Sequence, residues 1–387
     1  MGPHHRRVEV PKETTFLKGS YRMNGSSRQS DEAGRGKLAK LGVLAALAAG
    51  AVYAMRERRR IDFKGKNVLI SGASRGLGLE LARIFAAEGA GLLLLARDAE
   101  RLRQAARELE RYGTRISTFT CDVTDPVQVS QAVGAVLQTV SHVDVLINNA
   151  GMIQVGPMDN MALSDYEHAM AVHFWGPLQL INAIAPHMKA RGQGRIVNIT
   201  SIGGKVAVPH LLPYAASKFA LVGLSEGLRA ELLKDGIYVT TVCPGLMRTG
   251  SHLHAFFKGQ HKKEYALFAI ANATPLLSTS SEAAARAIVE ACRLGKAEIT
   301  ITPQARLLRV VNGLCPNFVS DTLAMVNRVL PKARVEAGGN VAKEGWTSRS
   351  MLAPSFLTRG SDAAAARNNE LPSGNGSIQL SAARSAK

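Results

Sequence analysis

Short apolar runs alternate with amphipathic stretches from residue 61 to about residue 302, and this pattern constrains the fold most. The seven runs are Asn67–Ser71, Gly91–Ala96, Arg115–Thr120, Val143–Ile147, Arg195–Ile199, Ile237–Val242 and Glu298–Thr302. Strands that alternate with helices usually pair in parallel, and a parallel sheet is covered by helices on both faces. The pattern therefore predicts an α/β domain over residues 61–302, with a doubly wound, parallel, seven-stranded sheet.

The remaining segments differ from this core. Residues 1–36 are rich in Gly, Ser, Arg and Lys without an apolar period, and predict a disordered basic tail. Residues 303–330 predict an apolar helical appendage that docks on the domain, on a second subunit or on a membrane. Beyond residue 331 the Ala, Ser, Gly and Asn content rises and the periodicity is lost, so residues 331–387 are predicted to be a second disordered tail.

Residues 37–60 contain an uncharged apolar run with basic flanks. As a helix, Leu38–Met55 spans about 27 Å, close to the roughly 30 Å of a hydrocarbon core. We predict a single-pass, N-terminal membrane anchor here. The alternatives are a buried or interfacial helix and a signal peptide cleaved near Ala49 or Ala51. Basic residues are more numerous after the run than before it, which predicts that the domain lies on the cytoplasmic side.

The net charge of +18 is concentrated at the two ends of the chain. Residues 1–60 hold 13 Lys and Arg against 5 Asp and Glu, and residues 331–387 hold 8 against 4. This distribution favours contact with anionic membrane lipid, and it predicts no nucleic-acid partner because the middle of the chain has no basic stripe. The four cysteines form no CxxC pair, so they predict reduced core residues and no metal site: Cys121, Cys243, Cys292 and Cys315.

A glycine-rich turn, Ser71–Gly78, joins the first predicted strand to the first helix. Glycines in such a turn let a pyrophosphate approach backbone N–H groups at the helix N-terminus, where the helix dipole favours an anion. The position between strand and helix predicts a dinucleotide site rather than a purely structural turn. The candidate cofactor-binding residues in this turn are Gly72, Ser74, Arg75, Gly76, Leu77 and Gly78.

The end of the second run indicates which dinucleotide is bound. An NAD site usually has an acidic residue here, on the ribose 2′-hydroxyl. This sequence has Arg97, and Arg75 lies in the glycine turn. Two guanidinium groups suit a 2′-phosphate, so we predict NADP(H). Asp98 leaves an acid one position later, and both arginines could instead be solvated surface charges.

Three residues further along form a candidate acid–base group. Tyr214 and Lys218 lie four apart, on one face of a predicted helix, and Ser201 follows the fifth run. A phenol titrates near 10 and is a poor acid–base group at neutral pH unless a cation stabilises the phenolate. Lys218 is placed to be that cation. A Tyr and a Lys four apart are common by chance, so the spacing alone is weak.

Together with Asn148–Gly151 after the fourth run and Pro244-Gly245 after the sixth, these motifs resemble the short-chain dehydrogenase/reductase family over residues 62–302. The resemblance implies a Rossmann-type fold, with Tyr214 as general acid/base. It implies that Lys218 lowers the pKa of Tyr214 and binds the nicotinamide ribose, and that Ser201 bonds the substrate oxygen. It adds cofactor contacts from Asp122, Val123, Asn149, Ala150, Gly151, Pro244, Gly245 and Thr249. Members of the family commonly form homodimers or homotetramers.

The chain departs from the family at one position. The family usually has Asn-x-x-Gly in the helix after the fourth strand, and its Asn holds a water that leads to the catalytic Lys. The corresponding residues here are His173-Phe174-Trp175-Gly176, with Pro177 next. His173 is therefore a candidate catalytic residue in a proton relay, and the alternative is a packed helix histidine.

The expected function is hydride transfer between NADP(H) and a carbonyl or secondary alcohol, with reduction of a lipid-like, steroid-like or long-chain ketone. Residues 249–281 are expected to close over the substrate with Leu253, Phe256, Phe257, Tyr265, Leu267 and Phe268. Basic residues in the same segment could equally meet phospholipid headgroups or an acidic substrate. The alternatives are a non-catalytic NADP-binding scaffold or redox sensor, and an epimerase or dehydratase, which usually needs a larger C-terminal domain.

Overall fold

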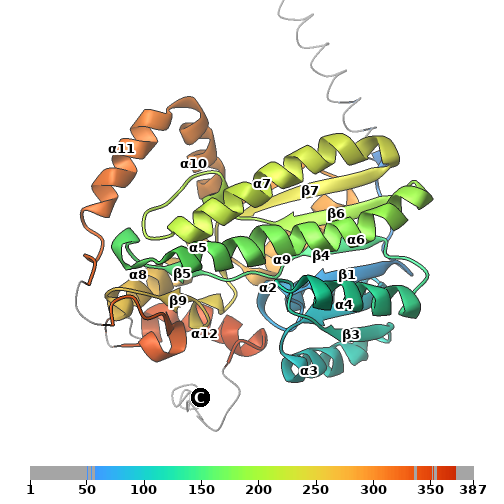
Figure 1. Ribbon diagram of the computed structural model, residues 1–387, viewed down its shortest axis with the longest axis horizontal. Coiled ribbons are helices and arrows are strands. Elements are labelled where there is room, and N and C mark those ends of the chain that lie inside the picture. Colours follow the sequence, from blue (N-terminus) through green and yellow to red (C-terminus); the bar gives the residue numbers. More distant parts are fainter. Residues whose placement is uncertain are drawn as a thin grey trace, which may run out of the picture. The chain divides into compact units, whose positions relative to one another are not determined.

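The computed structural model describes residues 50, 54, 57–334, 338–350, 352 and 355–371 (Figure 1). Two compact units divide the chain, Met1–Met55 and Arg56–Lys387, and every labelled helix and strand belongs to the second. The expected anchor, Leu38–Met55, lies almost entirely outside the described residues. Among the residues that are described, no helix is both long and apolar enough to cross a bilayer.

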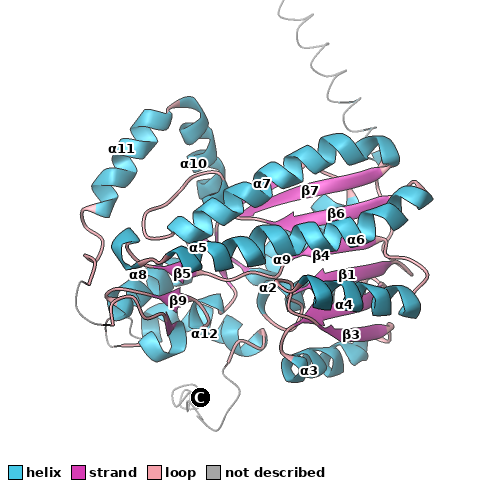
Figure 2. Ribbon diagram, in the orientation of Figure 1, coloured by secondary structure: helices cyan, strands magenta, loops and turns pink. Residues whose placement is uncertain are grey.

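A seven-stranded sheet of parallel strands forms the centre of the second unit, as the alternating pattern predicts (Figure 2). Its strand order is β11-β7-β6-β4-β1-β2-β3, so the chain starts in the middle and winds toward both edges. The strands are β1 (Asn67–Ser71), β2 (Gly91–Ala96), β3 (Ile116–Thr120), β4 (Val145–Asn148), β6 (Gly194–Ile199), β7 (Ile237–Pro244) and β11 (Glu298–Ile301).

Helices cover both faces of the sheet because both faces are apolar. Within β1, Val68 and Ile70 belong to one core and Leu69, which points the other way, belongs to the second. The first core lies under α2 (Gly76–Ala87), α3 (Ala99–Leu109) and α9 (Ser281–Arg293). The second lies under α4 (Pro126–Thr139), α6 (Gly176–Arg191) and α7 (Leu212–Leu232), which face the viewer in Figure 1.

Shorter elements gather at the carboxyl ends of the strands. They are α5 (Leu163–Met170), a π-helical turn over Ala171–Trp175, α8 (His261–Ala273), and the strands β5 (Gln154–Val155), β8 (Leu246–Arg248), β9 (Phe256–Phe257) and β10 (Ser278–Ser280). In open α/β sheets this edge is where ligands bind.

The predicted helical appendage is present as α10 (Pro303–Leu314) and α11 (Pro316–Asn327). Only Ala305 and Val319 are buried among the residues of these two helices. Most of their other large apolar side chains, such as Leu314 and Phe318, are exposed. Of the cysteines, three are buried as predicted, and Cys315 between the two helices is exposed.

The prediction that all of residues 331–387 form a disordered tail is wrong for part of this range. The strand β12 (Lys343–Glu344) pairs antiparallel with β9, and α12 (Ser355–Arg367) packs on α8. Ala364 and Ala365 are buried in this contact. Small residues such as these carry little apolar periodicity, so a helix that packs closely through them looks like low-complexity sequence.

Candidate active site

The glycine-rich turn between β1 and α2 needs glycine for steric reasons. Gly72 and Gly76 have left-handed backbones, with φ of 67° and 57°. A Cβ atom on Gly78 would lie 2.1 Å from the carbonyl oxygen of Gly72. Arg75, at the N-cap position of α2, makes no side-chain capping hydrogen bond. The N-terminus of α2 is therefore available to an anionic partner from outside the turn.

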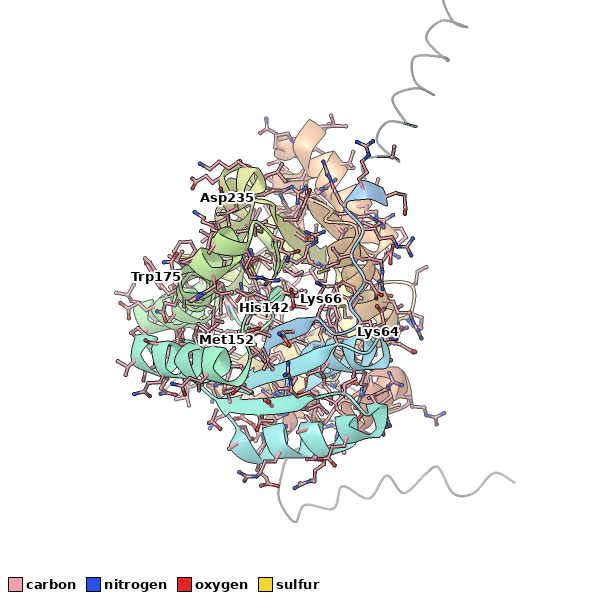
Figure 3. The ribbon with its side chains drawn as sticks, turned by 90° about the vertical axis from the view of Figure 1, so that its right-hand side faces the viewer. Lys64, Lys66, His142, Met152, Trp175 and Asp235 are labelled. Atoms are coloured by element: carbon pink, nitrogen blue, oxygen red, sulfur yellow. The ribbon has the colours of Figure 1, made fainter. Side chains whose placement is uncertain are left out.

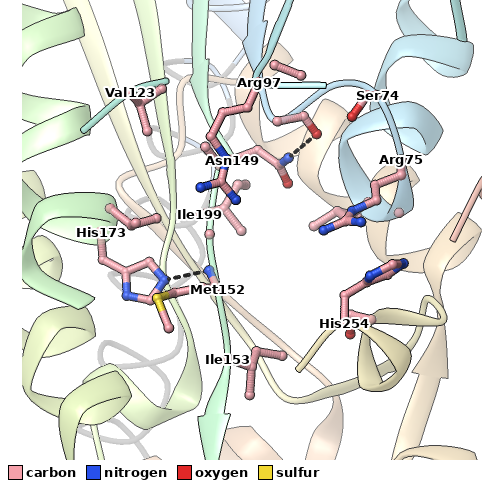
Figure 4. Close-up of a pocket in the computed structure, with 18 of the residues that line it drawn as sticks. Ser74, Arg75, Arg97, Val123, Asn149, Met152, Ile153, His173, Ile199 and His254 are labelled. Atoms are coloured by element: carbon pink, nitrogen blue, oxygen red, sulfur yellow. Dashed lines mark hydrogen bonds between the residues drawn. The ribbon is translucent and has the colours of Figure 1, made fainter. Parts of the chain in front are cut away.

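The loop after β4 is bonded directly to this turn. The Asn149 side-chain amide donates to the carbonyl oxygens of Ser71 and Gly72, both at 3.1 Å. The Ser71 hydroxyl oxygen accepts the backbone N–H groups of Asn149 and Ala150. The two predicted cofactor-binding segments are thus held together as one wall of the site (Figure 4).

Arg97 and Asp122 lie at the adjacent strand ends, as predicted. One guanidinium nitrogen of Arg97 lies 3.5 Å from the Asp122 carboxylate, and the Arg97 side chain is 62% exposed. Asp98 caps α3 and accepts the backbone N–H groups of Glu100 and Arg101. Arg97 and Asp98 both line the cavity at the end of β2. The Asp98 carboxylate already caps α3, whereas the Arg97 guanidinium caps no helix and remains accessible to a ligand.

Tyr214 and Lys218 lie one turn apart near the start of α7, beside Ser201 at the end of β6. The Lys218 ammonium lies 5.8 Å from the centroid of the Tyr214 ring and donates to the Ile199 carbonyl oxygen at 2.9 Å. The Ser201 oxygen accepts the backbone N–H of Gly203 at 2.9 Å. The Ser201 hydroxyl proton is therefore free to point at another acceptor, and the Tyr214 oxygen is that acceptor here.

Burial is the largest influence on the pKa of both titratable groups. It raises the pKa of Tyr214, against a smaller lowering by the hydrogen bond with Ser201. It lowers the pKa of Lys218 to about 7. The resemblance implies that Lys218 lowers the pKa of Tyr214, and in this structure the desolvation of Tyr214 outweighs any such effect.

The π-helical turn places His173 inside the site and Trp175 outside it. Trp175 projects from the surface and is 51% exposed (Figure 3), whereas His173 is fully buried. The His173 Nε2 accepts the backbone N–H of Met152 at 3.1 Å, so Nδ1 carries the proton and donates to the Ser217 hydroxyl at 2.8 Å. Burial holds the pKa of His173 well below its usual value. With both ring nitrogens bonded, the geometry favours a packed histidine over a proton relay.

A cavity of about 450 Å³ joins these residues. Four of the predicted site residues do not line it: Gly78, Ser201, Pro244 and Gly245. The other predicted residues do: Gly72, Ser74, Arg75, Gly76, Leu77, Arg97, Asp122, Val123, Asn149, Ala150, Gly151, His173, Tyr214, Lys218 and Thr249. Sequence reasoning missed Arg101, Met247 and Glu370, whereas His254, one of the basic residues of the 249–281 segment, also lines the cavity. In the sequence, Arg101 is only the third residue after Asp98, the cap of α3, and no motif marks it. Nothing in the local sequence marks Glu370 as part of a site.

The segment expected to cover the substrate is mostly part of the protein interior. Phe257 and Tyr265 form a small core with Val155 and Ala269, and Leu253 is also buried. Of the six predicted apolar contacts, only Phe256 lines the cavity. The prediction of a broad apolar cover is therefore wrong for these three buried residues, since a core side chain and a ligand contact have the same sequence pattern.

Two of the six basic residues in this segment, His252 and Lys258, are also buried. Lys258 lies 2.6 Å from Asp165 and is buried, His252 faces Asp362, and His254 faces Glu370. Lys262 and Lys263 are exposed. The expectation that these basic residues could meet headgroups or an acidic substrate is wrong for Lys258 and His252, which are buried in ion pairs, whereas His254 lines the cavity.

A dinucleotide fits the residues present at this edge of the sheet. The turn has no room for side chains at its glycines, and a carboxylate, that of Glu370, already lies against Gly76 at the N-terminus of α2. A site that holds a buried carboxyl group beside a helix N-terminus and basic side chains has the chemistry to hold a phosphate. Within the described ranges, no cluster of three or more His, Cys, Asp and Glu is arranged to hold a metal ion.

Comparisons with known proteins agree with this geometry. The family model described as short chain dehydrogenase matches residues 66–256. The chain is 40% identical to "Dehydrogenase/reductase SDR family member 7B" of Danio rerio, over 52% of this chain and 67% of the relative. It is 40% identical to "Fatty acyl-CoA reductase" of Acinetobacter baylyi, over 49% and 65%. The matches span about two thirds of the length of these relatives.

Solved structures are similar over most of the second unit. The L-sorbose reductase of Gluconobacter frateurii, complexed with NADPH and L-sorbose, superposes with a TM-score of 0.56 at 29% identity, covering 62% of this chain and 97% of that one. A short-chain dehydrogenase from Streptomyces avermitilis gives a TM-score of 0.59 at 29% identity, covering 70% and 98%.

The fold and the Ser201, Tyr214 and Lys218 group define an oxidoreductase that acts on CH–OH and C=O groups. The chain belongs to the short-chain dehydrogenase/reductase family.

Proposed function

We propose that this protein is an NADP(H)-dependent reductase of an apolar ketone. The observation that carries the proposal is that Tyr214 and Lys218 line the same cavity as the glycine turn, with Ser201 bonded to Tyr214. The same group argues against a non-catalytic scaffold, which has no need for a buried Lys beside a Tyr that lines the cavity.

Arg75 and Arg97 support NADP(H) over NAD(H). Both line the cavity, and Asp98 is engaged as the cap of α3. A carboxylate that caps a helix is not free to hold a ribose 2′-hydroxyl, whereas two guanidinium groups suit a 2′-phosphate. Two solved relatives are titled as complexes with NADPH or NADP, the L-sorbose reductase and a metagenomic oxidoreductase.

Apolar side chains on the same cavity support an apolar substrate. Met152, Ile153, Met247 and Phe256 line it. Relatives named fatty acyl-CoA reductase and putative ketoacyl reductase have acyl substrates in their names, although the L-sorbose reductase has a sugar. A ketone on a lipid-like or long acyl chain therefore fits better than a polyol.

The residues of the chain have separate parts in the reaction. The bound cofactor supplies the hydride. Tyr214 donates the proton to the substrate oxygen, and the Ser201 hydroxyl, whose oxygen already accepts from Gly203, donates a hydrogen bond to that oxygen. Lys218 holds its amino group beside the phenol, and in its ammonium form it has donors left for a ribose hydroxyl after bonding Ile199. His173 positions Tyr214 through Ser217, which donates to the Tyr214 carbonyl oxygen.

Membrane attachment through Leu38–Met55, with the domain on the cytoplasmic side, is a further part of the proposal. It is supported by the length and basic flanks of this segment. Assembly into a homodimer or homotetramer remains a proposal by family resemblance.

The test is NADPH oxidation by the detergent-solubilised full chain against a panel of ketones, with Tyr214→Phe as the control. The wild-type protein is expected to reduce long-chain ketones. Tyr214→Phe should lower kcat at least about 10²-fold and leave NADPH binding nearly unchanged, because it removes only the proton donor. Wild-type turnover in Tyr214→Phe, or NADPH binding without turnover of any ketone, would defeat the proposal.

A further inference from the structure

Residues Asn368–Leu371, here called the strap, follow α12 and cross the glycine turn. The backbone N–H of Gly76 donates to the Asn368 carbonyl oxygen at 2.9 Å. The Asn369 side-chain amide donates to the Ser74 carbonyl oxygen at 3.0 Å. The strap thus uses a backbone N–H at the N-terminus of α2, where a pyrophosphate would be expected to bind.

Asn368 fixes the strap to the domain. It is fully buried, and its side-chain oxygen accepts a guanidinium N–H of Arg83 at 2.9 Å. Its amide donates to the Thr249 carbonyl oxygen at 3.3 Å and to the Ser281 hydroxyl at 3.1 Å. These bonds join the strap to α2, to α9 and to the loop after β8. The strap therefore has one defined position on the turn.

Glu370 places a carboxylate among basic side chains. It is 3% exposed, and its Oε2 lies 3.4 Å from Arg75 and 3.5 Å from His254. Arg101 donates to the strap carbonyls of Asn369 and Leu371 at 3.0 and 3.2 Å. The Glu370 Oε2 is buried without a hydrogen-bond partner in the described part of the chain. Burial raises the pKa of Glu370 to about 7, so this carboxyl group is enclosed at a place that does not bond it completely.

The Glu370 carboxylate lies against Gly76, at the place where a cofactor phosphate is expected to approach the turn. A Cβ atom on Gly76 would lie 2.6 Å from the Glu370 Oε1. The glycine at this point of a dinucleotide turn is required so that the pyrophosphate can approach the backbone. Glu370 also lines the same cavity as Tyr214 and Lys218. The carboxylate therefore fills the space that a cofactor phosphate would need.

We propose that Arg75, Arg101 and His254, with the N-terminus of α2, form a phosphate site of the cofactor pocket, and that Glu370 fills this site until the cofactor displaces the strap. The proposal rests on the proposed use of NADP(H). Cofactor and strap then compete, and the apparent Kd for NADPH exceeds the intrinsic Kd by the inverse of the strap-free fraction. The C-terminal segment sets the cofactor concentration at which the enzyme becomes active.

The test measures NADPH binding by calorimetry on the full chain in detergent. Glu370→Ala removes the competing carboxylate. Asn369→Ala loosens the strap, because it removes the side-chain bonds to the carbonyl oxygens of Ser74 and Arg101 and leaves the guanidinium and imidazole groups of the basic cluster in place. Both are expected to tighten NADPH binding, by about tenfold where the strap is docked nine-tenths of the time. Glu231→Ala, an exposed glutamate at the far end of α7, is the matched control and should leave the Kd unchanged.

Hydrogen exchange gives a readout that is independent of turnover. NADPH should increase exchange at the amides of residues 368–371 in the wild-type protein. Unchanged or weaker NADPH binding in both strap variants, or increased protection of these amides with NADPH, would overturn the proposal and make the strap a fixed wall. Absence of NADPH binding in the wild type and in every variant would instead overturn the proposed function, and this site with it.

Discussion

The imidazole ring of His173 stands edge-on to the phenol ring of Tyr214, with ring centroids 5.4 Å apart and planes at 89°. Edge-to-face contacts of this kind are favourable and fix the relative orientation of two rings. His173 reaches this position because the π-helical turn before Pro177 rotates it inward. Such turns often occur at functional sites. The ring therefore supports Tyr214 from the side, while its nitrogens hold Met152 and Ser217.

His173→Ala should lower kcat more than it changes KM, because it leaves the buried N–H of Met152 unpaired and frees the Tyr214 ring. The unpaired group alone costs about 1–3 kcal/mol. His173→Asn offers a side-chain oxygen to the same N–H and should recover most of the lost kcat. Steady-state kinetics and thermal unfolding of the two variants check this. Equal losses in both would mean that the position requires an imidazole.

Arg97→Asp should weaken NADPH far more than NADH. It replaces a guanidinium at the expected 2′-phosphate position with a repelling carboxylate, and one charged hydrogen bond contributes about 1.5–3 kcal/mol, or roughly 10- to 100-fold in affinity. KM values for the two cofactors measure the effect. Arg103→Asp, which changes an exposed arginine on α3, is the control. Equal losses for NADPH and NADH would show that Arg97 does not read the 2′ position.

Ketone reduction should decline as the pH rises above about 7. Burial lowers the pKa of Lys218 to about 7, so its ammonium form predominates below that pH and is lost above it. If catalysis needs the ammonium, kcat/KM is level on the acidic side and falls by up to tenfold per pH unit on the alkaline side. Lys218→Arg should be slower overall. Because arginine keeps its positive charge, the variant should not show the alkaline decline in kcat/KM. A wild-type profile that stays level to pH 9 would contradict the assignment.

Gly78→Ala should unfold at a lower temperature and bind NADPH poorly. The new methyl group would lie 2.1 Å from the Gly72 carbonyl, a backbone atom that cannot move without opening the turn. Overpacking of this kind costs roughly 1–3 kcal/mol or more. Gly134→Ala in α4 is the matched control, since a Cβ there meets nothing within 4 Å, and alanine should stabilise that helix by about 0.5–1 kcal/mol. Thermal unfolding and calorimetry compare the two.

The full chain should stay in membranes after high-salt or alkaline washing, which removes proteins held by charge alone. A chain that begins near Arg60 should be released into solution and still bind NADPH, because β1 begins at Asn67. Protease added from outside should not reach the domain. Release of the full chain by salt would mean peripheral attachment, and an N-terminus just after Ala51 would mean a cleaved signal.

The sheet and the catalytic group could be predicted because their signals are local. Each strand of the sheet is an apolar run of its own, and β2, with the sequence Gly-Leu-Leu-Leu-Leu-Ala, is buried almost throughout. Tyr214 and Lys218 lie on one helix, so their spacing alone places them together. The glycine turn is similarly contained within a few residues.

The strap and the interior of the 249–281 segment could not be predicted because their contacts are distant in sequence. Asn369 meets Ser74, 295 residues away. The run Arg-Asn-Asn-Glu-Leu that contains it has no period, and its order comes from partners that the local sequence does not specify. Tyr265 looks like a ligand contact in the sequence and is a core residue in the structure. Whether an aromatic side chain faces a cavity depends on tertiary packing.

The bond between Arg83 and Asn368 has a consequence for how the chain matures. It joins residues 285 positions apart, and at about 5–20 residues per second a ribosome needs roughly 15 to 60 s to make the chain between them. Helix and sheet formation takes far less time than that. The cavity needs residues up to Phe256, which is made 112 positions before Asn368, or roughly 6 to 22 s earlier at the same rate. The cofactor pocket of a newly made chain can therefore meet dissolved nucleotide before the strap can compete for it.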